Sequence, residues 1–181
     1  YLQGPNGSGK STLLRLMAGL LRPVSGELLW GGENTRDDPE IFRGRLHYVG
    51  HQDAVKTALT VEENLTFWAE MSGAEPEKRL VRDALKTFSL THLAALPARF
   101  LSAGQRKRLN LARICASAAP LWLLDEPANS LDTDSVVALR HAIAAHQDKG
   151  GMVAVATHEE LVSDSNILDI SEFTSSNRGA L

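Results

Sequence analysis

The sequence predicts an α/β domain with a mostly parallel sheet and a helical subdomain. Strand-like apolar runs alternate along the chain with segments of helical periodicity, the pattern of parallel strands joined by helices. A glycine-rich loop at residues 4–11 separates a strand-like start from an apolar helical run, which is the setting of a phosphate-binding loop. Ligands of such domains bind at the carboxyl ends of the strands, so we expect functional side chains at that edge.

The loop reads Gly-Pro-Asn-Gly-Ser-Gly-Lys-Ser and matches the G-x-x-x-x-G-K-[ST] pattern. Its glycines let successive backbone N–H groups wrap the α- and β-phosphates of a nucleotide triphosphate. Lys10 reaches the β- and γ-phosphate oxygens, and the Ser11 hydroxyl ligates Mg²⁺. The helix that follows presents its N-terminus, which favours anions. We expect the phosphates to be bound by Gly4, Pro5, Asn6, Gly7, Ser8, Gly9, Lys10, Ser11 and Thr12.

The position of this loop predicts that part of the domain precedes the chain. Residues 1–3 read as the tail of a strand, and no initiator methionine is present. A phosphate-binding loop needs a full buried strand to hold it, so we expect N-terminal β strands to be missing. The chain is interpreted as a fragment of a longer protein.

Short strands and then helices are predicted in the first half. We expect a helix from Lys10 to about Leu20, a strand over 27–30, a polar loop with a helical turn over 33–44, and a strand over 46–49. Thr60 and Glu63 form a capping box before a helix that ends near Gly73, and Glu75-Pro76 opens another helix. Residues 53–100 are therefore predicted to form the helical subdomain.

The second half returns to the alternation of helix and buried strand. We expect a helix from Gly104 to about Ala118, a strand over 121–124, a helix from Asp132 to about His146, a strand over 151–156, a short helix over 159–162 and a strand over 167–170. Residues 1–52 and 101–170 then form the core of a single domain, 1–181, and residues 171–181 form a polar tail.

Two carboxylates end the strand over 121–124. Successive side chains of a strand point to opposite faces, so Asp125 and Glu126 can have different roles. Asp125 is suited to hold Mg²⁺, directly or through water, and Glu126 to orient or deprotonate an attacking water. A strand that simply ends in solvated acids is the alternative, which the upstream phosphate loop makes less favourable.

The pentapeptide Leu-Ser-Ala-Gly-Gln at 101–105 opens a helix. Ser102 reads as the N-cap of that helix, which is by itself a sufficient structural explanation. The functional alternative is a second anion site, made by Ser102, the Gly104 N–H and Gln105 at a helix N-terminus. Ala103 indicates that the backbone there does not need a positive φ.

In the order and spacing of these motifs, the chain resembles the nucleotide-binding subunits of ATP-binding cassette (ABC) transporters. The resemblance covers nearly the whole chain and implies an ABC ATPase core that hydrolyses Mg²⁺-ATP. It also implies a head-to-tail dimer, in which residues 101–105 of one copy close over ATP held by the other. By the same analogy Glu126 is the general base, His158 contacts the γ-phosphate, Gln52 links Mg²⁺ and water to membrane-embedded partner subunits, and Asp132 couples the two sites.

Each of these residues also has a simpler structural reading. Gln52 can be a surface glutamine, Asp132 the N-cap of its helix, and His158 a residue at a helix start. The other histidines show no paired metal-ligand spacing, and we expect them to be solvated: His47, His51, His92, His141 and His146.

A finer resemblance is carried by residues 47–52, 56–60, 63–68 and 102–108. These stretches are similar to the ATP-binding subunit of the bacterial haem exporter of cytochrome c maturation. The resemblance implies a peripheral protein at the cytoplasmic face of the inner membrane, held there by integral membrane subunits. An ATPase of another bacterial transporter is the nearest alternative.

Composition and motif spacing argue against two other classes of ABC-type ATPase, those of DNA repair and those of translation. ABC-type ATPases of DNA repair carry a long coiled coil or a zinc-binding insertion between the phosphate loop and the pentapeptide. Here fewer than 100 residues, with no heptads and no cysteine, separate them, and the net charge of −3 attracts no nucleic acid. Translation factors of this type carry tandem cassettes, whereas this chain has one. No apolar run reaches the roughly 18 residues that cross a bilayer.

Overall fold

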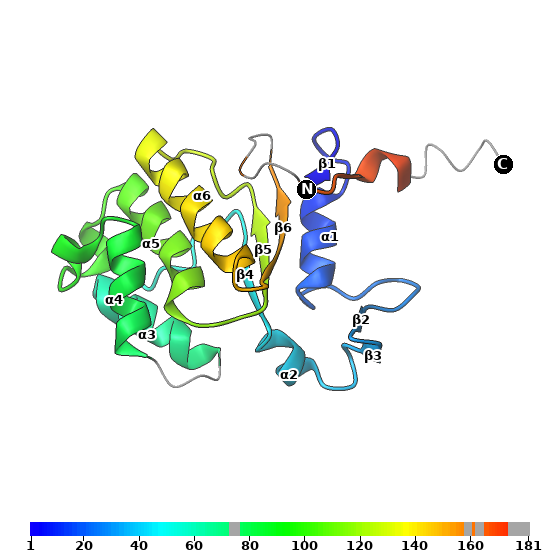
Figure 1. The fold of residues 1–181 in the computed structure, drawn as a ribbon, viewed down its shortest axis with the longest axis horizontal. Coiled ribbons are helices and arrows are strands. Elements are labelled where there is room, and N and C mark those ends of the chain that lie inside the picture. Colours follow the sequence, from blue (N-terminus) through cyan, green and yellow to red (C-terminus); the bar gives the residue numbers. More distant parts are fainter. Residues whose placement is uncertain (73–76, 158–160, 162–164, 174–181) are drawn as a thin grey trace.

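Among the described residues, five parallel strands form the sheet at the centre of the fold. The computed structural model describes residues 1–72, 77–157, 161 and 165–173 (Figure 1). The strands lie in the order β4 (Leu46–Val49), β5 (Leu121–Asp125), β6 (Met152–Ala156), β1 (Leu2–Gln3) and β7 (Leu168–Asp169), and every neighbouring pair is parallel. The predicted α/β class with a mostly parallel sheet is therefore confirmed.

Strand β5 divides the core between the two faces of the sheet. Leu121 and Leu123 belong to the apolar cluster that contains Leu14 of α1 (Lys10–Met17). Trp122 and Leu124 belong to the larger cluster on the other face, with α5 (Ala103–Ala116) and α6 (Thr133–Gln147). Figure 1 shows α1 on one side of the strands and α5 and α6 on the other. Since side chains alternate along a strand, Asp125 continues the α1 side.

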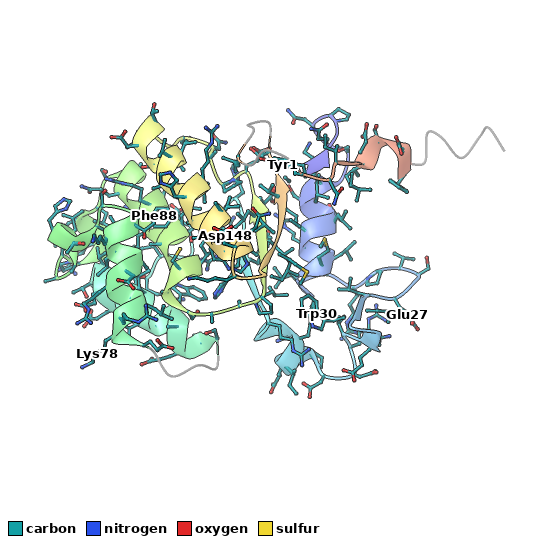
Figure 2. All side chains as sticks on the ribbon, viewed as in Figure 1. Tyr1, Glu27, Trp30, Lys78, Phe88 and Asp148 are labelled. Atoms are coloured by element: carbon teal, nitrogen blue, oxygen red, sulfur yellow. The ribbon has the colours of Figure 1, made fainter. Side chains whose placement is uncertain are left out.

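A group of helices packs together beside the sheet. Helices α3 (Val61–Met71) and α4 (Lys78–Thr87) both pack on α5, and the 3₁₀ turns η1 (Thr91–Leu93) and η2 (Ala98–Phe100) follow. Phe88, labelled in Figure 2, is buried within this group. The predicted capping box is present, since Glu63 N donates to Thr60 Oγ1 and Thr60 N donates to the Glu63 carboxylate. Among the described residues, no helix is long and apolar enough to cross a membrane.

The region between the first helix and β4 differs from the expectation. β2 (Leu29–Trp30) is shorter than the predicted strand and pairs antiparallel with β3 (Glu33–Asn34), where we expected a loop. The turn between them works because Gly31 and Gly32 both have positive φ. The expected helical turn is α2 (Pro39–Arg43), whose first turn is capped by the Asp38 carboxylate.

The end of the chain also differs. β7 stops at Asp169, and residues 170–173 form the 3₁₀ helix η3 where the strand and the polar tail were expected to meet. The physical reason is local, because the Asp169 carboxylate accepts hydrogen bonds from both the N–H and the hydroxyl of Ser171. The helix expected over 159–162 falls, apart from Leu161, outside the described residues.

Two histidines that we expected in solvent are packed instead. His47 lies in β4 with Nε2 3.1 Å from the Ser117 carbonyl oxygen, and burial lowers its pKa to about 4. The His146 ring stacks on Trp122, with centroids 3.9 Å apart and planes 6° apart. Gly151 lies so close that a Cβ there would be 2.2 Å from His146 Nε2. The expectation was wrong for these two because residues distant in sequence cover them.

The half-buried His47 predicts that the protein loses stability in mild acid. Its folded pKa of about 4 lies below the ordinary histidine pKa of 6.5, so the unfolded chain binds the proton more readily. The stabilisation is complete above the unfolded pKa and is lost as the pH falls towards 4. Between pH 7 and pH 5 this histidine should lower the free energy of unfolding by about 2 kcal/mol. Urea titrations of wild type and His47→Gln at both pH values measure the difference. Parallel losses in the two proteins would contradict the assignment.

Candidate nucleotide site

Residues 4–9 form the connection between β1 and α1, and its glycines adopt conformations that other residues avoid. Gly4, Gly7 and Gly9 have φ values of 143°, 83° and 102°. A Cβ on Gly4 would also lie 2.7 Å from Ser8 Oγ, so space as well as φ excludes a side chain there. Gly9 is the N-cap of α1, which places the helix N-terminus at the end of the loop.

The loop is fitted to an anion. Lys10 is 8% exposed, and its Nζ donates to the carbonyl oxygens of Gly4, at 2.7 Å, and Pro5, at 3.1 Å. Ser8 Oγ is buried and has no hydrogen-bond partner among the described residues. A buried cation, an unsatisfied hydroxyl and a helix N-terminus therefore meet at one glycine cradle, which suits the phosphates of a nucleotide. Asn6 and Thr12 are exposed beside it.

Ser11 and Asp125, which the sequence places 114 positions apart, are in direct contact. The Ser11 hydroxyl donates to Asp125 Oδ1 at 2.9 Å, and Asp125 is 2% exposed at the end of β5. A hydroxyl and a carboxylate are hard oxygen ligands of the kind that Mg²⁺ takes. The described residues contain no group of three His, Cys, Asp or Glu side chains that could hold a metal. The pair therefore suits an ion that keeps waters and phosphate oxygens as its other ligands.

Glu126 follows in an unusual backbone conformation. Its φ of 49° is in the left-handed region, which non-glycine residues rarely adopt. Its N–H still donates to the Ala156 carbonyl oxygen at 2.8 Å, so the ladder with β6 extends one residue beyond β5. Strained backbone of this kind is typical of functional sites. The half-buried Glu126 thus stands next to the Ser11–Asp125 pair at the carboxyl edge of the sheet.

Gln52 is exposed in the loop that leaves β4 at the same edge. β4 and β5 are neighbours with Val49 opposite Leu124, so this loop starts beside Asp125. A cleft of about 710 Å³ adjoins the loop, and its walls include Arg15, Tyr48, Gln52, Trp68 and Arg113. This cleft lies between the helical group and the α1 side of the sheet.

The pentapeptide opens α5 as an N-cap. Ser102 Oγ accepts from Gln105 N at 3.2 Å, and Gln105 Oε1 accepts from Ser102 N at 2.9 Å, which is a capping box. Gly104 has open space where a Cβ would point. Leu101 is anchored in the larger cluster, whereas the phosphate loop leads into the cluster of α1. The pentapeptide and the loop therefore belong to different faces of the sheet.

Of the remaining predicted site residues, the structure describes Asp132 but not His158. Asp132 is the N-cap of α6 and accepts from Ser135 N at 2.8 Å, and the hydrogen bonds of Ser135 hold the pKa of this carboxyl below its usual range. His158 lies outside the described residues, directly after the buried Thr157.

Sequence reasoning missed Lys107 as part of this region. Burial lowers the pKa of the Lys107 ammonium, and the charges of Asp53, Asp125 and Glu126 oppose that shift. A half-buried cation on α5 therefore stands within electrostatic reach of the carboxylates that end β5. The only sequence signal was its place two residues after the pentapeptide.

Comparisons with known proteins show which proteins this chain is similar to. A family model described as ABC transporter matches residues 1–129. The cytochrome c biogenesis ATP-binding export protein CcmA of Rhodospirillum rubrum is 55% identical over 160 residues, which are 88% of this chain and 68% of that protein. The protein of that name from Paramagnetospirillum magneticum is 51% identical, over 88% of this chain and 75% of its own length.

Solved structures are similar as well. A dimeric ATP-binding cassette in a post-hydrolysis state, bound to ADP and Pi, superposes with a TM-score of 0.76 at 28% identity, over 87% of this chain and 73% of that one. The ATP-binding subunit of an ABC transporter gives a TM-score of 0.76 at 27% identity, over 87% of this chain and 67% of its own.

Proposed function

This chain belongs to the ABC transporter family, and from that premise we propose that it is the ATP-binding and ATP-hydrolysing subunit of an exporter that serves cytochrome c biogenesis. The observation that carries the proposal is the Ser11–Asp125 hydrogen bond, because it joins the phosphate loop to the carboxylate strand in one metal-nucleotide site. The relatives named above support the choice of pathway. Haem is the cargo that we propose, on the resemblance of the stretches within residues 47–108.

In the bound state the loop N–H groups and the N-terminus of α1 hold the phosphates. Lys10 exchanges its two carbonyl partners for β- and γ-phosphate oxygens, which are stronger acceptors because they are charged. Ser11, Asp125 and Gln52 would hold Mg²⁺, which neutralises charge on the transferred phosphoryl group when it is bound. Pre-alignment of Ser11 and Asp125 favours this arrangement.

Hydrolysis needs a base beside that pair, and Glu126 is our candidate. The water oxygen bonds to the γ-phosphorus while its proton passes to the Glu126 carboxylate, and the bond to the β-phosphate oxygen breaks to leave ADP and phosphate. His158 would contact the γ-phosphate. The left-handed backbone at Glu126 supports this role, since it turns the chain immediately after the metal-side aspartate.

We propose that the complete site uses two copies of the chain. Ser102, Gly104 and Gln105 of one copy would cover the γ-phosphate bound by the other, and Asp132 would link the two sites. The attachment of the pentapeptide and the phosphate loop to different faces of the sheet supports this, as does the dimeric state of the similar ADP-bound cassette. Gly104 is exposed, and a Cβ built there would meet no atom within 4 Å, so this surface of the chain is open to a partner copy.

The cleft beside Gln52 is where we propose that the integral membrane subunits dock. It lies next to the helical group, and an occupant would touch both Gln52 and Trp68. Binding there would transmit the state of the nucleotide to the transporter and hold this chain at the cytoplasmic face of the bacterial inner membrane.

Restoration of cytochrome c assembly tests this function. Expression of the protein in bacteria that lack the ATP-binding subunit of the cytochrome c haem exporter should restore covalent haem on periplasmic cytochromes, as measured by haem staining. The same protein with Glu126→Gln should not restore it at equal expression. Failure of the wild type there, with rescue of a strain that lacks a different exporter, would assign another cargo.

A further inference from the structure

The backbone of Ala54, two residues after Gln52, is held at both of its polar groups. Its N–H donates to Asn110 Oδ1 at 3.2 Å, and its carbonyl oxygen accepts from Trp68 Nε1 at 3.1 Å. Trp68 is on α3 and Asn110 is on α5, so two helices reach the loop from outside the sheet. We refer to Asn110, Trp68 and Arg113 as the Ala54 clasp.

Asn110 is a costly residue to bury at this place. It is 1% exposed, and its Nδ2 has no hydrogen-bond partner among the described residues. A buried amide with an unsatisfied donor is unfavourable, and an apolar side chain of similar size would avoid that penalty. The hydrogen bond that Asn110 Oδ1 accepts from the Ala54 N–H therefore gives the reason for an asparagine at this buried position.

Arg113 fixes Trp68 in the orientation that reaches Ala54. Its guanidinium lies 4.8 Å from the centroid of the Trp68 ring, and it donates to the carbonyl oxygen of Tyr48 in β4. Burial lowers the pKa of Arg113 to about 10, so it remains charged at neutral pH, and the charge of Asp53 favours that state. The clasp thus connects β4, the Gln52 loop and both helices.

We propose that Asn110 and Trp68 are positioning residues for the reaction. They fix the position of the Gln52 loop relative to α5 and to the pentapeptide at the N-terminus of α5. Neither side chain touches the reacting atoms. They act through the Ala54 backbone, so that Gln52 meets the Ser11–Asp125 pair when α3 and α5 are in the correct place. The proposal rests on the proposed function, since it gives Gln52 its role at the metal.

Asn110→Leu and Asn110→Asp form the matched pair that tests this. Leucine removes the acceptor at similar size, whereas aspartate keeps an acceptor oxygen for the Ala54 N–H. Hydrogen exchange of the Ala54 amide should be about tenfold faster in Asn110→Leu and near wild type in Asn110→Asp. Trp68→Phe is the second variant, which keeps the ring over Arg113 but removes the indole donor. Thr66→Ala on the same helix is the control.

The kcat for ATP hydrolysis and its dependence on Mg²⁺ distinguish a positioning role from a merely structural one. Asn110→Leu and Trp68→Phe should each lower kcat by about tenfold and raise the Mg²⁺ concentration that gives the half-maximal rate. Loss of a group that orients a metal ligand has effects of this size. The Kd for ATP without metal should stay unchanged, and Asn110→Asp should recover most of kcat. Unchanged Ala54 exchange in Asn110→Leu, or faster exchange with normal kcat and Mg²⁺ dependence, would overturn the proposal.

The two proposals fail in different ways. A wild-type protein that hydrolyses no ATP would refute the proposed function and the positioning role together, even with a slowly exchanging Ala54 amide. If the wild type hydrolyses ATP and the rate is unchanged when both side-chain hydrogen bonds to Ala54 are removed, the positioning role alone is refuted. If Asn110→Leu does not fold, Trp68→Phe decides by the same kcat and Mg²⁺ criteria.

Discussion

Replacing Glu126 with glutamine should reduce ATP hydrolysis about a thousandfold and leave ATP binding intact. Glutamine has the same size and tolerates the φ of 49° no worse than glutamate, but its amide cannot accept a proton from water. The Ser11–Asp125 pair and the phosphate loop are untouched by the change. ATP should therefore remain bound, and the closed dimer should accumulate instead of turning over.

Single-turnover hydrolysis and size-exclusion chromatography with light scattering measure the two effects. With Mg²⁺-ATP, Glu126→Gln should elute as a dimer, and the wild type should return to monomer as ATP is consumed. Asp134→Asn, which removes an exposed acid from the first turn of α6, is the control and should behave as wild type. Normal turnover in Glu126→Gln would remove Glu126 from the role of base.

Lys10→Ala and Gly104→Asp should each abolish ATP hydrolysis, for different reasons. Lys10→Ala removes the buried ammonium from the phosphate loop, and we expect a Kd for ATP about 100-fold higher, because about two charge-assisted hydrogen bonds are lost. Gly104→Asp leaves nucleotide binding to its own loop intact but adds a carboxylate where a partner's γ-phosphate would lie. Gly104 has open space and no positive φ, so aspartate should fold there without strain.

Calorimetry with ATP separates the two variants. Lys10→Ala should lose affinity, and Gly104→Asp should bind ATP normally but form no ATP-dependent dimer. Lys78→Ala, at an exposed lysine on α4, is the control for loss of one positive charge. A normal Kd in Lys10→Ala would contradict the assignment of the phosphate loop.

The parts of the site that follow from local rules could be predicted from the sequence. The phosphate loop requires glycine at positions of positive φ, so the residues themselves reveal it. Ser11 and Asp125 could each be assigned to Mg²⁺, because the phosphate loop and the carboxyl end of the strand over 121–124 meet at one edge of a parallel sheet. The N-caps at Ser102 and Asp132 could likewise be predicted, because serine and aspartate are preferred N-cap residues and each precedes a segment of helical periodicity.

Other features depend on contacts that no local pattern encodes. β3 has two residues, too few for a periodic signal, and was read as loop. His47 contacts the Ser117 carbonyl oxygen, 70 residues away, and so its pKa could not be inferred from its neighbours in sequence. The hold of Trp68 and Asn110 on Ala54 joins three segments, and only the packing of α3 on α5 brings them together.

Residues 101–105 of one copy should complete the ATP site of another, and mixing the two inactive variants tests this directly. A mixed dimer of Lys10→Ala and Gly104→Asp has one site in which both changes fall and one site that is intact. Random pairing makes about half of the dimers mixed, so a 1:1 mixture should recover about a quarter of the wild-type sites in single-turnover hydrolysis. If the mixture stays as inactive as its components, the pentapeptide does not act across the dimer, and the two-copy site is contradicted.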